Sequence, residues 1–156
     1  MNGVVTAVRF VNLFAAGLLG GGLVMVLLGI IPTLRTFPAP VDHRMHLTFD
    51  PLADRFMPAS GIVAGLTAIV LLAIDSDRTA LGVAGYAAGL VGSIGIAGLS
   101  EIYLRPTNRR FRALQSDALP ADYPRQRETW NRVHGIRTAL GLLAFGGYLV
   151  ATLAAS

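Results

Sequence analysis

The stretch Phe10–Ile31 reads FVNLFAAGLLGGGLVMVLLGII and contains no charged residue. A helix needs about 20 mainly apolar residues to cross the hydrocarbon core of a bilayer, so this stretch predicts a membrane-spanning helix. Its apolar part is longer than the roughly 7–15 residues of a signal-peptide core, which favours an uncleaved anchor. Three more stretches carry no charge: Ala59–Ile74, Ala80–Ser100 and Thr138–Ser156.

The composition agrees with a membrane protein. Hydrophobic residues make up 53% of the chain and charged residues only 14%, whereas soluble domains carry about 25% charged residues. The basic residues are all arginine and cluster beside apolar segments, a pattern typical of membrane proteins rather than of nucleic-acid binding. The absence of cysteine excludes disulfides, thiolate metal sites, covalent c-type haem and cysteine nucleophiles.

We therefore predict an all-α membrane protein with one integral membrane domain over residues 1–156, folded as a four-transmembrane-helix up-down bundle. The expected spans are approximately 10–31, 57–74, 80–104 and 135–155. The tight link 75–79 makes the second and third spans antiparallel neighbours, and its Asp and Ser residues can cap the third span. The two long loops, 32–56 and 105–134, lie together on the other side.

Proline suggests where these long connections are not helical. The stretch Pro32–Pro58 holds five prolines, so we expect it to be mostly irregular up to a helix start at Asp50. In the second connection, Pro106 is expected to end the third helix. A new helix should begin near Asp122, with Pro124 in its first turn, and run to the C-terminus.

The arginines give an expected orientation. Most lie in the two long loops, and the opposite side has only Arg9 and Arg78. The positive-inside rule then places both long loops in the cytoplasm and both termini outside, in a multi-pass protein of the plasma membrane. None of the spans has an ionisable residue at its centre, which argues against a pump or an ion channel.

Glycine recurs inside the spans at four-residue spacing. The pairs are Gly17 with Gly21, Gly61 with Gly65, and Gly85 with Gly89. Small residues at this spacing let helix backbones approach closely within a membrane. We expect packing within the bundle, with homo-oligomer contacts as the alternative.

The most informative polar segment is Arg127–Arg137, RETWNRVHGIR, which leads into the last span. Arg127, Trp130, His134 and Arg137 fall on one helix face. An interfacial aromatic belt would explain this stripe. Alternatively, His134 is a general base, Arg137 stabilises the resulting anion, and Trp130 stacks on a flat substrate.

Two other groups are candidates. Asn108 and Arg109, just after the third span, could hold an oxygen-rich or anionic ligand, or they could contact lipid head groups. His43 and His46 could join His134 in a three-histidine site for zinc, copper or iron, although no further ligand motif supports a metal.

The combination of motifs resembles the anthrone oxygenase-like family of small integral membrane proteins (the DUF1772 family). The residues that carry the resemblance are Ile31-Pro32-Thr33-Leu34, Pro106-Thr107-Asn108-Arg109-Arg110 and Trp130-x-x-x-His134-x-x-Arg137. The resemblance implies a four-span helical protein. In some members it implies oxidation of a polyketide anthrone to an anthraquinone by molecular oxygen, with no recognised cofactor.

The resemblance implies roles for the candidate residues. His134 would be the base, with Asn108, Arg109 or Arg137 facing the oxyanion, and Trp130 and Arg127 binding the substrate. The expected partners are the lipid bilayer, a hydrophobic small molecule and O2. Two alternatives stay open from the sequence: a non-catalytic assembly or lipid-binding protein, and a redox protein that uses haem or a metal.

Overall fold

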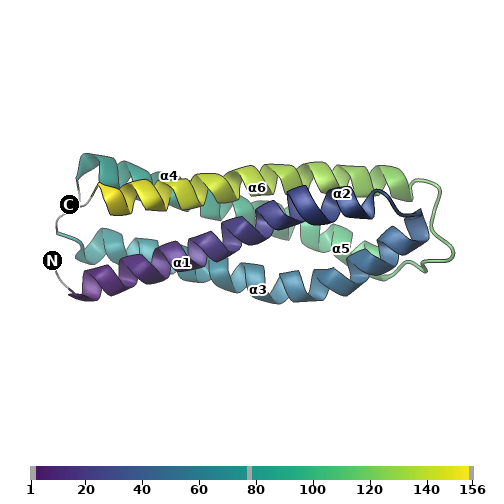
Figure 1. The fold of residues 1–156 in the computed structure, drawn as a ribbon, viewed down its shortest axis with the longest axis horizontal. Coiled ribbons are helices and arrows are strands. Elements are labelled where there is room, and N and C mark those ends of the chain that lie inside the picture. Colours follow the sequence, from purple (N-terminus) through teal and green to yellow (C-terminus); the bar gives the residue numbers. More distant parts are fainter. Residues whose placement is uncertain (1–2, 77–78, 155–156) are drawn as a thin grey trace.

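Four long helices run side by side in the computed structural model, which describes residues 3–76 and 79–154 (Figure 1). The chain order is α1 (Gly3–Met25), the π-helical turn η1 (Val26–Ile30), α2 (Ile31–Leu34), α3 (Ala39–Ile74), α4 (Ala80–Leu99), the π-helical turn η2 (Ser100–Leu104), α5 (Arg105–Arg112) and α6 (Tyr123–Leu153). No strand occurs among the described residues, so the prediction of an all-α up-down bundle is confirmed.

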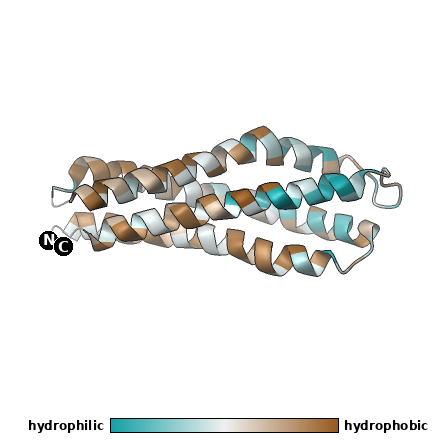
Figure 2. Ribbon diagram, turned by 90° about the horizontal axis from the view of Figure 1, so that it is seen from above, coloured by the Kyte–Doolittle hydropathy of each residue, from teal (hydrophilic) through white to brown (hydrophobic). Residues whose placement is uncertain are grey.

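Four helical stretches are long and apolar enough to cross a membrane: Gly3–Leu34, Arg55–Ile74, Ala80–Arg112 and Tyr123–Leu153. The described termini and the α3–α4 link lie at one end of the bundle, and both long connections lie at the other (Figure 1). Hydrophilic residues gather at that second end, which we call the polar end (Figure 2).

The short link forms largely as predicted, because α3 ends at Ile74 and α4 begins at Ala80. The predicted cap is corrected, however. The Thr79 side chain, rather than an Asp or Ser, accepts a hydrogen bond from the Gly82 N–H at 3.1 Å. Arg78, which contributes to the predicted orientation, lies outside the described residues, as do Asp77 and residue 155, the last of the fourth predicted span.

The prediction that Pro32–Pro58 is mostly irregular is wrong. The α3 helix is continuous from Ala39 and contains Pro51 and Pro58 in its interior. Interior prolines are tolerated in membrane helices because neighbouring helices and local adjustments satisfy the freed backbone groups. The N-terminal part of α3 bends away from the line of the rest of the helix, as expected at interior prolines (Figure 1).

Pro106 does not end the third helix either. It follows η2, in which the Arg105 N–H bonds to the Ser100 carbonyl five residues back, and the chain then continues as α5. Pro32 follows η1 in the same way, with the Ile31 N–H bonded to the Val26 carbonyl. A π-helical turn relieves the clash between a proline ring and the preceding turn without breaking the helix. By contrast, α6 begins at Tyr123 with Pro124 in its first turn, as predicted.

The closest helix contact joins α4 and α6 through glycines. A Cβ atom placed on Gly85 would lie 2.6 Å from the Gly147 carbonyl oxygen and 2.8 Å from the Ala151 nitrogen. A Cβ on Gly92 would lie 2.6 Å from the Leu140 carbonyl oxygen. For the Gly85 and Gly89 pair, the prediction of packing within the bundle is therefore confirmed, whereas Gly21 and Gly65 have nothing within 4 Å of such a Cβ.

This contact gives a stability prediction. We expect Gly85→Ala to destabilise the protein by roughly 1–3 kcal/mol, the usual cost of overpacking, because the added methyl group meets backbone atoms that cannot move aside. Gly21→Ala is the matched control, since its methyl group meets open space. Thermal unfolding in one detergent tests this, and equal midpoints for both variants would contradict the close α4–α6 contact.

Candidate functional site

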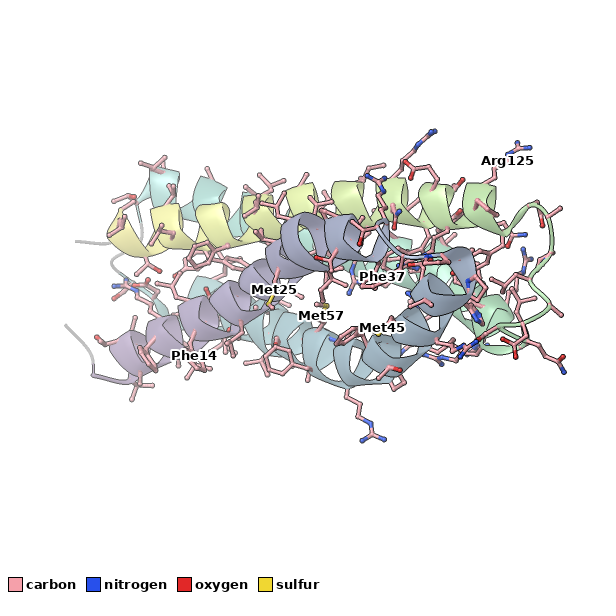
Figure 3. The ribbon with its side chains drawn as sticks, turned by 45° about the vertical axis from the view of Figure 1, so that its right-hand side comes forward. Phe14, Met25, Phe37, Met45, Met57 and Arg125 are labelled. Carbon is pink, nitrogen blue, oxygen red and sulfur yellow. The ribbon has the colours of Figure 1, made fainter. Side chains whose placement is uncertain are left out.

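A cavity of about 630 Å³ lies among α1, α3, α4 and α6 and reaches the polar end of the bundle. Met25 and Met57 both line it and lie near the middle of the bundle in Figure 3, whereas Arg125 points outward at the polar end. The predicted residues on its wall are Asn108, Arg127, Trp130, His134 and Arg137, to which the structure adds His46, Asp50 and Glu101.

Arg109 is the exception among the predicted catalytic and substrate-binding residues. Its side chain is exposed on α5 and does not line the cavity. Its neighbour Asn108 is buried, because the two side chains point to different faces of the helix. The structure therefore does not bring Arg109 to the site.

Trp130 is held by a chain of hydrogen bonds that joins three helices. Its indole Nε1–H donates to Asn108 Oδ1 at 2.7 Å. The Asn108 amide donates in turn to the buried carboxylate of Asp50 on α3, which also accepts from Arg112 of α5. A buried amide or carboxylate without partners is costly, so this chain fixes α3, α5 and α6 relative to one another.

A second buried network positions Arg127. Its Nε–H donates to Asp42 Oδ2 at 3.2 Å, and the Tyr123 hydroxyl donates to the same oxygen at 3.0 Å. The Arg127 guanidinium carbon lies 4.6 Å from the centre of the Trp130 ring, a cation–π arrangement. Arg127 therefore both lines the cavity and holds one face of the Trp130 ring.

His134 is stacked on Trp130, with ring centres 5.2 Å apart and planes inclined by 10°. Its Nε2 lies 3.3 Å from the Leu23 carbonyl oxygen. A carbonyl can only accept, so Nε2 carries the proton and Nδ1 carries the lone pair. That Nδ1 is buried without a hydrogen-bond partner, while the residue lines the cavity.

The other two histidines differ from His134 and from each other. His43 uses both ring nitrogens, at 2.9 Å from the Phe111 carbonyl oxygen and 2.9 Å from Ser116 Oγ, and so ties α3 to α5 and the following loop. His46 packs edge-on against Trp130 with ring centres 5.0 Å apart, and its Nε2 has no partner.

These positions do not assemble the three-histidine metal site. His43 has no ring nitrogen left for a metal, and His46 and His134 each pack against the Trp130 ring. Over residues 3–76 and 79–154, no three His, Cys, Asp or Glu side chains are grouped as metal ligands.

The sequence did not predict that Asp42 and Asp50 belong to this site, and it suggested His46 only as a possible metal ligand. The three are buried on α3 at four-residue intervals, which places them on one helix face. That spacing was visible in the sequence. The surrounding prolines predict an irregular loop, so the sequence gives no reason to expect helical periodicity there.

Together the fold and the site define a four-helix membrane protein with a cavity whose polar end is built around a single tryptophan and two histidines. The family model for anthrone oxygenase matches residues 45–147. The chain belongs to the anthrone oxygenase family. No curated protein and no solved structure matches the chain.

The Trp130 network gives a second prediction. Asn108→Ala leaves the indole N–H and Asp50 short of a partner, so we expect a loss of stability of about 1–3 kcal/mol. Because Trp130 is the only tryptophan of the chain, its fluorescence spectrum reports the site directly. Arg109→Ala is the control and should leave both stability and emission unchanged. Unaltered emission in Asn108→Ala would contradict the hydrogen bond.

His46 gives a prediction about pH. Burial, reinforced by the positive charge of Arg127, lowers the pKa of His46 from 6.5 to about 3. Between these values the unfolded chain binds a proton that the folded protein does not, so stability falls as the pH drops below 6.5. The slope is up to about 1.4 kcal/mol per pH unit.

The comparison variant is His46→Gln, which cannot titrate. Unfolding measured at pH 7, 6 and 5 should show a shallower loss of stability for this variant than for the wild type. Parallel pH profiles would show that His46 is not a buried neutral group.

Proposed function

We propose that this protein is a membrane oxygenase that oxidises an acidic carbon of an aromatic, polyketide-like substrate with O2. The observation that carries the proposal is that His134 lines the cavity and has a buried Nδ1 without a hydrogen-bond partner. Its contact with the Leu23 carbonyl sets the tautomer and leaves the lone pair on Nδ1, as a general base requires.

The reaction begins with proton transfer. His134 Nδ1 takes a proton from the methylene carbon of the substrate, and the electron pair left behind is delocalised into the ring system and its carbonyl oxygen. Arg137 lies one turn further along α6 and lines the same cavity, and in the proposal its guanidinium group stabilises that oxyanion. Trp130 supplies a flat surface for the ring system.

The carbanion then reduces O2. A carbon–oxygen bond forms, and the resulting peroxide takes the proton from the His134 imidazolium to give a hydroperoxide. Loss of the second proton from the same carbon expels hydroxide as the oxygen–oxygen bond breaks, which leaves a ketone. The hydroxide and that proton form water, so one CH2 group and one O2 give one C=O group and one H2O.

This chemistry needs no resident cofactor, because an electron-rich carbanion reacts with O2 directly. Asn108 and Arg127 have positioning roles in the proposal, because their hydrogen bonds and ring contact hold Trp130 and the neighbouring acids Asp50 and Asp42. We also propose, from the arginine count alone, that the polar end faces the cytoplasm and that the membrane is the plasma membrane.

The test is oxygen uptake with a model anthrone, corrected for uncatalysed oxidation. Removing a general base typically costs 10²–10⁴-fold, so we expect kcat/KM of His134→Gln to fall at least 100-fold. Glutamine retains an amide N–H that can donate to Leu23 but cannot take the proton. Arg109→Ala should keep the wild-type rate. Equal rates in His134→Gln and the wild type would exclude His134 as the base.

A further inference from the structure

The cavity is much longer than the polar site at its end. Its lining residues run along α3 from His46 to Ile69, and along α4, η2 and α5 from Leu90 to Asn108. At 1.5 Å per residue these stretches span roughly 25–35 Å of helix. A three-ring aromatic molecule against Trp130 therefore leaves a long part of the cavity unfilled.

We call this second part the arm. It is the portion that lies away from the polar end and is lined by Gly61, Ile62, Gly65, Leu66, Ile69, Leu90, Ser93, Ile94 and Ala97. Ser93 is its only side chain with a polar group, and its hydroxyl is hydrogen-bonded to the Tyr148 hydroxyl at 2.9 Å. An occupant of the arm must therefore do without hydrogen bonds along its length, which suits a hydrocarbon chain.

The arm is open to the lipid. α4 packs chiefly on α6, and α3 packs chiefly on α1, so the seam between α3 and α4 is the loosest of these contacts. On this seam Ile62 is 61% exposed, Leu66 58% and Ile94 69%. All lie in the apolar spans, so a molecule dissolved in the bilayer can reach the arm sideways.

Glycine provides the width of the arm. A Cβ on Gly65 would meet no atom within 4 Å, and one on Gly61 would meet only Leu19, at 3.5 Å. The space beside Gly65 is therefore not needed for helix packing within the bundle. It is available to a ligand.

We propose that the substrate carries a long aliphatic chain, of the acyl or prenyl kind, that lies in the arm while its acidic aromatic head lies against Trp130 and His134. This inference rests on the proposed function for the identity of the head. The arm and the polar site are parts of one cavity, so a chain lying in the arm has its head at the polar end.

The test compares Gly65→Leu with Gly21→Leu. Both substitutions put the same side chain into open space, but only Gly65 lines the cavity. The probes are phenol and a phenol with a twelve-carbon alkyl chain, titrated without oxygen while the fluorescence of Trp130 is recorded. This readout is independent of turnover, and comparing variants with one ligand cancels its partition into detergent.

Leucine at position 65 should fill the arm and exclude part of the chain. Each excluded methylene costs roughly fourfold in affinity, so we expect binding of the alkyl phenol to weaken at least tenfold in Gly65→Leu. Binding of phenol itself should not change, and Gly21→Leu should match the wild type with both probes. An alkylated model anthrone should show the same pattern in kcat/KM.

Two results would overturn the proposal. One is equal affinity of Gly65→Leu and the wild type for the alkyl phenol. If the affinities are equal and less phospholipid co-purifies with Gly65→Leu than with the wild type, the arm holds a structural lipid. The other is equal weakening of both phenols, which would mean that the substitution damages the head site. Chain-dependent binding without any oxygen uptake would instead uphold the arm and refute the proposed oxygenase activity.

Discussion

The glycine contact between α4 and α6 is the constraint on which the rest of the structure depends. Gly85 and Gly92 face backbone atoms of α6 at distances that only a hydrogen side chain allows, so the two helices can neither separate nor slide freely. The same antiparallel register continues through η2 into α5, where it brings Asn108 opposite Trp130. A packing contact inside the membrane thus positions the polar site at its end.

The membrane also explains why that site is so densely bonded. Near the apolar core, water is scarce and each unsatisfied polar group is costly. Asp50 and Asp42 accordingly have partners on α5 or α6, and these bonds hold the polar ends of the helices together. Some buried polar atoms at this end still lack a partner: one ring nitrogen each of His46 and His134, and the Nη1 atom of Arg127.

The sequence predicted the bundle well because span length, charge depletion and the tight link at 75–79 are local properties. It also placed Trp130, His134 and Arg137 on one face, since that needs only helical periodicity. The sequence-based prediction failed where the fold overrides the usual tendency of proline to end a helix. Two π-helical turns carry the chain past Pro32 and Pro106, and the long α3 helix accommodates its interior prolines. Because this part of α3 was predicted to be irregular, its buried face was not predicted to form part of the site. The pairing of Asp50 with Asn108 joins distant segments and could not be read from one sequence.

The three histidines show why residue type alone could not rank the candidates. All three lie within one end of the bundle, and each is buried. Both ring nitrogens of His43 form structural hydrogen bonds. In His134 only Nε2 has a partner, the Leu23 carbonyl, and this contact leaves the lone pair on Nδ1. His46 borders the same tryptophan, and its burial, reinforced by the charge of Arg127, lowers its pKa and keeps it neutral. The partners of the ring nitrogens therefore distinguish the structural His43 from His46 and His134, and only the folded chain supplies those partners.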